Sequence, residues 1–193
     1  MVKLNKIYTR TGDDGTSGLV DGSRMSKAGL RLTAIGEVDE ANSFVGVAIA
    51  ALDDEHEILA DRLRLIQNEM FDLGADLATP GEIEGALRIT AGQVARIEGG
   101  IDFMNADLAP LTSFILPGGS AAVGALHVAR AVVRRAERAA VALMAAEAVN
   151  HHAIAYLNRL SDHLFVAARS VAATEGGDVL WQPGATRGQQ TIC

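Results

Sequence analysis

Four arginines and one glutamate stand in an otherwise apolar stretch, residues 126–138, and could together bind an anion. Neither Gly nor Pro interrupts the stretch, so it is predicted to be helical. At about 100° per residue, one arc of roughly 100° collects the polar side chains. These are His127, Arg130, Arg134, Glu137 and Arg138. The opposite arc is apolar and is expected to be buried; it holds Ala129, Val132, Val133, Ala136, Ala140 and Leu143.

Two interpretations of the polar arc are open. The simpler one is a solvated helix face with salt bridges on it. The sharper one is a phosphate site, because arginine makes bidentate contacts with phosphate and Glu137 can hold one guanidinium in place. Arg135 points partly away from both arcs, so it belongs clearly to neither.

A second polar stretch lies near the N-terminus, where residues 9–18 are rich in Gly, Thr and Asp and the polar character continues to Lys27. It lacks helical periodicity and is predicted to be a loop. Its glycines permit positive φ, and its backbone N–H groups and hydroxyls can surround an anion. No Gly-Lys-Ser/Thr sequence closes it, so it is not a Walker A loop, and a plain surface loop is the simpler interpretation.

Apolar residues at helical spacing predict five helices that bring these stretches together. Their expected bounds are 34–52, 54–78, 90–105, 120–148 and 150–174. Thr90, Ser120 and Asn150 are expected N-caps. Glu37, Asp39 and Glu40 are expected in the first turns of the first helix, where carboxylates suit the helix dipole. Short links between the helices predict an up-and-down bundle in one domain, residues 1–193.

The remaining segments carry single notable residues. Phe114, in the loop before the fourth helix, would ordinarily be a hydrophobic anchor. Asp162 follows Asn158 by four residues on the fifth helix, so the two are expected to meet. Gly99-Gly100 weakens the middle of the third helix. Trp181, in the C-terminal tail (175–193), needs a groove or a ligand to cover it.

Composition narrows the possible classes of protein. The 193 residues are 49% hydrophobic but only 4% aromatic, which favours close-packed helices. The net charge of −7 argues against general nucleic-acid binding. Cys193 is the one cysteine, so no internal disulfide can form. The first residues lack a signal sequence, and no apolar run is long enough to span a bilayer, so we expect a cytoplasmic protein with no membrane partner.

Four motifs, in order and at compatible spacing, carry a resemblance to a known family. They are residues 9–16, residues 36–43, residues 114–119 leading into 127–138, and residues 156–162. Over about residues 5–182 the chain resembles the PduO-type ATP:cob(I)alamin adenosyltransferases.

The resemblance implies an all-α fold, a five-helix bundle that forms a homotrimer with active sites between adjacent subunits. It implies transfer of the 5′-deoxyadenosyl group from ATP to the cobalt of cob(I)alamin, assisted by Mg²⁺ that is bound mainly through the ATP phosphates. The products would be adenosylcobalamin and inorganic triphosphate. A flavin-dependent reductase and an adenosylcobalamin-dependent mutase are the partners that this chemistry suggests.

The family's functional positions fall on specific residues of this chain. The N-terminal segment, residues 1–33, would bind ATP through Thr9, Arg10, Thr11, Gly12, Asp13, Gly15, Thr16 and Lys27. Arg134, Glu137 and Asn158 match the other ATP-binding positions, Arg134 being the phosphate contact. Asp39 and Arg130 match a pair that joins neighbouring subunits beside the site. Phe114 matches the aromatic that displaces the lower axial ligand of cobalt, which eases reduction of Co(II).

One residue departs from the family pattern, and three rival functions are open to a helical bundle of this kind. Asp14 stands where many members carry Lys, so it would face the metal or solvent instead. A non-catalytic helical scaffold would not need the Gly-rich loop and the arginine arc together. A ferritin-like di-metal bundle needs Glu-x-x-His motifs, which Glu137 and Glu147 do not provide. A nucleotide-binding corrinoid carrier is the closest rival, and triphosphate release would distinguish it from an enzyme.

Overall fold

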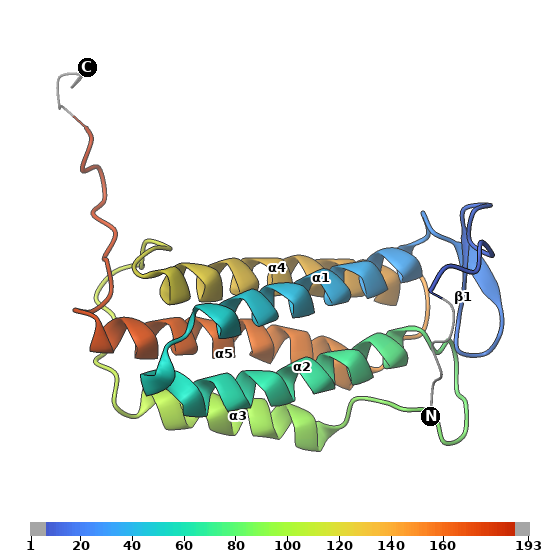
Figure 1. Cartoon of the computed structure of the whole chain (residues 1–193), viewed down its shortest axis with the longest axis horizontal. Coiled ribbons are helices and arrows are strands. Elements are labelled where there is room, and N and C mark those ends of the chain that lie inside the picture. The colour runs from blue at the N-terminus through green and yellow to red at the C-terminus, as the bar shows by residue number, and fades with distance from the viewer. Residues whose placement is uncertain (1–6, 188–193) are drawn as a thin grey trace.

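The computed structural model describes residues 7–187, which form an elongated bundle of five α-helices (Figure 1). The helices are α1 (Leu30–Ala51), α2 (Glu57–Leu77), α3 (Ala91–Asn105), α4 (Ala121–Met144) and α5 (His151–Thr174), and a short 3-10 helix, η1 (Asp54–His56), precedes α2. The predicted five-helix, all-α architecture is confirmed. Among the described residues, no helix is both long and apolar enough to cross a membrane.

Small side chains let the central helices pack closely. α1 packs chiefly on α4, which also packs on α5. The buried stripe of α1 consists of Ala34, Val38, Ala41, Val45 and Ala48, and the predicted apolar arc of α4 is buried throughout. Alanine at these contacts allows short distances between helix axes, which explains why so few aromatic residues are needed.

The expected N-caps are confirmed. Thr90 forms a capping box with Gln93, Ser120 Oγ accepts a hydrogen bond from the N–H of Val123, and Asn150 Oδ1 accepts one from the N–H of His152. Each side chain satisfies a backbone donor that has no partner within its helix.

The first helix begins earlier than predicted, at Leu30 rather than residue 34. The cause is Arg31, whose buried guanidinium pairs with Glu147 at 2.6 Å and donates to the carbonyl of Leu77. The expectation that Glu37, Asp39 and Glu40 act on the helix dipole is therefore wrong, because they lie beyond the first turn. Glu37 and Glu40 instead pair with Arg135 of α4.

The N-terminal stretch is also more ordered than the predicted loop. β1 (Thr16–Gly18) and β2 (Arg24–Ser26) pair as an antiparallel hairpin. Its turn contacts the end of α2, where the N–H of Val20 donates to the carbonyl of Ala78 at 3.1 Å. This contact, together with Arg31, fixes the hairpin at the end of the bundle where α1 begins and α2 finishes (Figure 1).

A buried carboxylate, Asp76, organises the same end of the bundle. It accepts hydrogen bonds from Arg88 Nη1 at 2.8 Å, from the N–H of Ile89 at 2.8 Å and from Asn150 Nδ2 at 2.7 Å. Asp76 thereby joins α2 to the segment before α3 and to the N-cap of α5.

We expect Asp76→Ala to lower the free energy of unfolding by about 3–5 kcal/mol, because it removes the carboxylate that pairs with the partly buried Arg88 and leaves the buried N–H of Ile89 without its acceptor. Urea denaturation at a fixed protomer concentration measures this loss. Asp61→Ala, which removes only the exposed pair with Arg64, is the control and should cost about 1 kcal/mol or less. Similar losses in the two variants would contradict the role given to Asp76.

Candidate functional site

The N-terminal hairpin and the loop before it form a cradle of exposed polar groups. Arg24 of β2 donates to Thr16 Oγ1, through Nε at 3.0 Å and Nη2 at 2.7 Å, and also to the carbonyl of Thr11. Asp14 accepts from the hydroxyl and the N–H of Thr16 at 2.7 and 2.9 Å. These bonds, led by the one from the Thr16 hydroxyl, lower the pKa of Asp14.

Backbone geometry in this cradle depends on particular residues. Gly15 has a φ of 81°, and Arg10, with a φ of 62°, is the one non-glycine residue of positive φ in the described chain. Lys27 Nζ donates to the carbonyl of Gly12 at 2.8 Å. A Cβ on Gly12 would lie 2.9 Å from that Nζ and 3.1 Å from the carbonyl oxygen of Thr16, so the loop needs glycine there. Thr9 and Thr11 share a hydroxyl–hydroxyl hydrogen bond of 2.9 Å.

The arginines of α4 separate into paired and unpaired ones. Arg135 is held by Glu37 and Glu40, as a salt-bridged face would require. Arg134 is exposed, and neither it nor Arg130 has an ion pair within residues 7–187. The Nε of Arg130 is buried without a hydrogen-bond acceptor. Burial, and then the charge of Arg134 one turn away, lower the pKa of Arg130, so two cations lie close together without a counter-charge.

Glu137 and Asn158 are brought together as neighbours of these arginines. Asn158 Nδ2 donates to Glu137 Oε1 at 2.9 Å, and Asn158 Oδ1 accepts from Arg159. The expected contact of Asn158 with Asp162 does not form, because Glu137 and Arg159 take its amide group.

Phe114 lies at the far end of the bundle and is not the buried anchor that its type suggested. Its side chain is 77% exposed and lies against Trp181, with ring centroids 6.1 Å apart. The tail is fixed there by three bonds. The N–H of Trp181 donates to the carbonyl of Phe114 at 2.7 Å, Ser113 Oγ donates to the carbonyl of Trp181 at 2.7 Å, and Leu116 N–H donates to the carbonyl of Val179 at 2.8 Å. Trp181 was expected to need a groove or ligand over its ring, and Phe114 covers it in part. The last tail residues, 188–193, lie outside the described part of the chain.

Beside Phe114 opens a pocket of about 590 Å³ that also reaches Arg130. Its wall includes His127 and Phe165, whose rings are 6.3 Å apart. His127 is buried, and this burial, followed by the nearby Arg130, lowers its pKa, so the ring is neutral near pH 7. The pocket therefore combines an aromatic rim, a neutral imidazole and one guanidinium.

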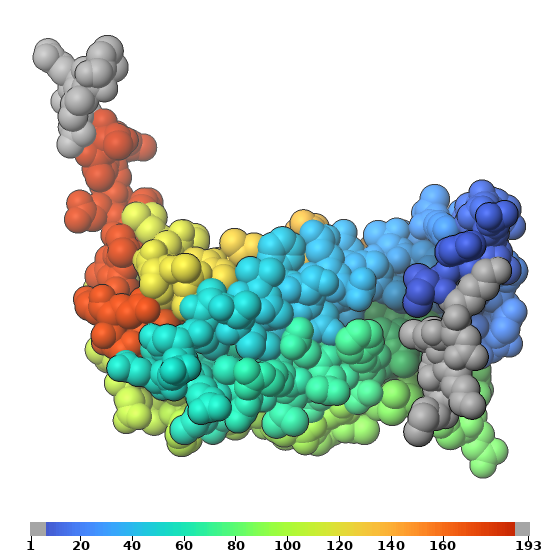
Figure 2. Space-filling view, in the orientation of Figure 1, coloured from blue at the N-terminus to red at the C-terminus, as the bar shows by residue number. Residues whose placement is uncertain are grey.

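One chain does not bring all the predicted site residues together. The hairpin lies at one end of the bundle and the Phe114 loop at the other, as Figures 1 and 2 show. The helix between them, α4, has 24 residues and is about 36 Å long. Asp39 of α1 is exposed and has no partner for its carboxylate among the described residues.

Comparison with known proteins identifies the family of the chain. Residues 7–171 match the family model described as cobalamin adenosyltransferase. The chain belongs to the cobalamin adenosyltransferase family. This membership confirms the resemblance that the four motifs carry.

Several bacterial relatives in the cobalamin adenosyltransferase family match along almost their whole length. A corrinoid adenosyltransferase of Mycobacterium tuberculosis is 51% identical over 191 residues, which cover 96% of this chain and 97% of the relative. One from Bacillus subtilis (strain 168) is 46% identical over 183 residues, covering 93% and 94%. The solved structure of a phenylalanine-to-alanine variant of the PduO-type ATP:corrinoid adenosyltransferase from Lactobacillus reuteri, complexed with cobalamin and ATP, has a TM-score of 0.87 and 38% identity. That match covers 92% of this chain and 99% of the other.

The sequence did not predict the part that some residues have in the site. Arg24 was missed although it links Thr11 with Thr16, and its one signal was a basic residue close to Lys27. Ser113 and Trp181 were not predicted to act together, since 68 residues separate them in the sequence. Within residues 7–187, no group of three or more His, Cys, Asp or Glu side chains could hold a metal ion.

Proposed function

We propose that this protein transfers the 5′-deoxyadenosyl group of ATP to the cobalt of cob(I)alamin, giving adenosylcobalamin and inorganic triphosphate. The observation that carries the proposal, beside family membership, is the pair Arg130 and Arg134. Neither guanidinium is paired with a carboxylate within residues 7–187, so the two give α4 a local positive charge, and the exposed Arg134 is suited to an anionic ligand.

The protein supplies position and charge rather than a nucleophile, because cob(I)alamin is itself strongly nucleophilic. The reduced cobalt attacks C5′ of ATP, the C5′–O bond breaks, and the electron pair leaves with the triphosphate. Arg134 stabilises the charge that develops on this leaving group. Mg²⁺ enters with the substrate, bound to the ATP phosphates, and the N-terminal cradle holds the nucleotide through its backbone N–H groups and hydroxyls.

Phe114 and Arg130 define where the corrinoid binds. The exposed ring of Phe114, on the rim of the pocket, excludes a lower axial ligand from cobalt. Arg130, which reaches the same pocket, pairs across the subunit boundary with Asp39 of a neighbouring copy, because neither charged group has an ion-pair partner among residues 7–187 of its own chain.

We further propose a homotrimer in which the cradle of one subunit faces the Phe114 end of the next. The separation of the two half-sites along the bundle supports this arrangement, since a complete site needs a second copy. The setting is the cytoplasm, with a flavin-dependent reductase supplying reduced corrinoid and an adenosylcobalamin-dependent mutase using the product.

An anaerobic assay tests the function. The protein is mixed with ATP, Mg²⁺ and chemically reduced cob(I)alamin, the visible spectrum is followed for the Co–C bonded product, and triphosphate is assayed in parallel. Equal amounts of adenosylcobalamin and triphosphate are expected. ATP binding without product would favour a nucleotide-binding corrinoid carrier. Binding of neither ligand would favour a non-catalytic helical scaffold.

Gly12→Ala tests the cradle. The added Cβ displaces Lys27 or the carbonyl of Thr16, so we expect the KM for ATP to rise on the order of 10-fold with little change in stability. Gly18→Ala is a matched control, because a Cβ there meets nothing within 4 Å. A KM that changes equally in both variants would mean that the shape of the Gly12 loop does not matter for ATP.

A further inference from the structure

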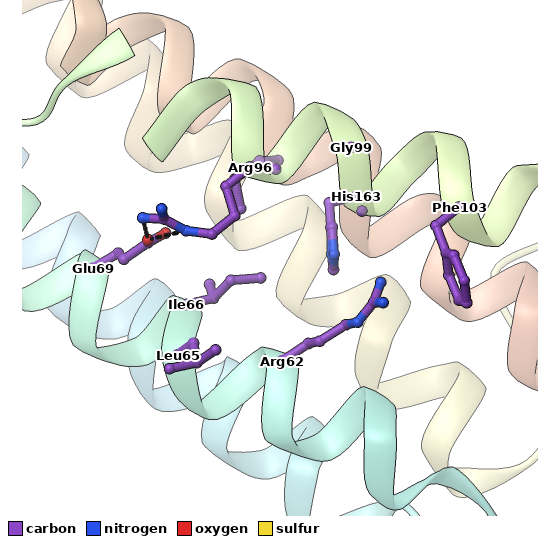
Figure 3. Close-up of a pocket in the computed structure, with 10 residues that line it drawn as sticks. Arg62, Leu65, Ile66, Glu69, Arg96, Gly99, Phe103 and His163 are labelled. Carbon is purple, nitrogen blue, oxygen red and sulfur yellow. Dashed lines mark hydrogen bonds and ion pairs between the residues drawn. The ribbon is translucent and has the colours of Figure 1, made fainter. Parts of the chain in front are cut away.

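A second cavity, of about 400 Å³, is lined by none of the residues assigned above. It lies between α2 and α3, and α5 contributes His163 to its lining (Figure 3). Leu65, Ile66, Ile97 and Phe103 give it mainly apolar walls. Such a volume and lining are typical of a site for a small organic molecule.

The cavity exists because α2 and α3 pack on other helices more than on each other. α2 packs chiefly on α1, and α3 on α5. Gly99 and Gly100, the two glycines in the middle of α3, both line the space. A Cβ on Gly100 would lie 3.0 Å from His163 Nε2, so glycine there lets the helix lie against the imidazole. A Cβ on Gly99 would meet nothing within 4 Å, so glycine there leaves the adjoining space unfilled.

The charges around the cavity leave one cation without a counter-charge. Arg96 pairs with Glu69, whose other oxygen accepts from the hydroxyl of Tyr156 at 2.9 Å. The guanidinium of Arg62 lies over the ring of Phe103, 4.5 Å from its centroid, and has no carboxylate partner within residues 7–187. The lining therefore carries a net charge of about +1, from two arginines and one glutamate.

His163 adds an unsatisfied polar group. Its side chain is 2% exposed, and neither ring nitrogen has a hydrogen-bond partner in the described chain. Figure 3 shows the ring reaching into the cavity toward Arg62. Burial, and then the charge of Arg62, lower the pKa of His163 to about 4, so it is neutral near pH 7 and can exchange one hydrogen bond with a ligand. Buried polar groups without a partner are uncommon and costly.

We propose that this cavity is a binding site for a small monocarboxylate with an apolar body. The carboxylate pairs with Arg62 beside Phe103 and hydrogen-bonds to His163, and the apolar body lies along Leu65, Ile66 and Ile97. A single negative charge matches the single unpaired cation, whereas a polyphosphate would bring several charges beside Glu69.

Calorimetric titration of the full-length protein with octanoate, without ATP or corrinoid, tests the proposal. The neutral probe 1-octanol has the same chain length and should bind at least about 10-fold more weakly, since it cannot pair with the guanidinium. Arg62→Met removes the charge but keeps an apolar stem, and should weaken octanoate about 10-fold or more. Arg64→Met is the matched control, because Arg64 pairs with Asp61 outside the cavity, and it should bind as the unaltered protein does.

Gly99→Leu assigns the binding to this cavity. The substitution favours helix and fills the space, so octanoate binding should disappear while thermal unfolding remains cooperative. Three results would overturn the proposal: no octanoate binding up to about 10 mM, a weak limit for a specific site; equal affinity for octanol; or affinity that Arg62→Met leaves unchanged. Because binding is the readout, these results are independent of whether the protein proves to be an adenosyltransferase.

Discussion

Arg134→Ala is expected to lower kcat for adenosyl transfer by about 10²–10³-fold, the loss typical of removing one preorganised donor to a developing negative charge. The triphosphate gains charge as the C5′–O bond breaks, so the contact is stronger in the transition state than in the bound substrate. Because Arg134 is exposed and has no ion pair within the described chain, its removal should leave the fold intact. Single-turnover kinetics with preformed cob(I)alamin measure the effect.

Two companion variants separate charge from geometry. Arg134→Lys keeps the positive charge but loses the planar fork, so it should recover only part of the rate. Arg64→Ala removes an exposed arginine elsewhere on the bundle and should leave kcat unchanged. If Arg134→Ala turned over with near-normal kcat and KM for ATP, the proposed contact with the leaving group would be wrong.

Phe114→Ala is expected to slow the Co(II)-dependent reaction at least about 10-fold more than transfer from preformed cob(I)alamin, a difference of about 1.4 kcal/mol between the two barriers. In the proposed role the exposed ring excludes the lower ligand of cobalt, and a Co(II) centre without that ligand is easier to reduce. Once cobalt is already Co(I), this contribution is no longer needed. Parallel assays, one starting from cob(II)alamin with a reductant and one from preformed cob(I)alamin, measure the two losses.

Leu111→Ala is the control for Phe114, because it trims another apolar residue of the same pocket. It should affect both assays to a similar, smaller extent. Equal losses in the two assays for Phe114→Ala would mean that its ring serves only to pack against the corrinoid or Trp181.

The helical part of the fold was predictable because its information is local. Apolar residues at 3.6-residue spacing identify five helices, and the capping residues Thr90, Ser120 and Asn150 mark three of their starts. The division of α4 into a buried and a polar arc follows from the same periodicity. The pairing of Arg135 with α1 could not be predicted in this way, because its acidic partners lie almost 100 residues earlier in the sequence.

What could not be predicted depends on contacts between distant segments. The early start of α1 rests on Arg31 and Glu147, and the hairpin rests on Arg24 and the end of α2. Short two-stranded ribbons have weak sequence signals, since their stability comes from what they pack against. The individual roles of the site residues and the division of the chain at residues 33 and 174 stay predictions, because each depends on a ligand or a second subunit.

The placement of the cradle and the Phe114 pocket at opposite ends of one chain has a genetic consequence. In a closed ring of three, every site would take its cradle from one subunit and its pocket from the next. A chain defective in the cradle and a chain defective in the pocket, each inactive alone, would form mixed rings in which one boundary joins two intact halves. Two such alleles would therefore restore activity to each other when expressed in one cell, whereas two alleles damaged in the same half would not.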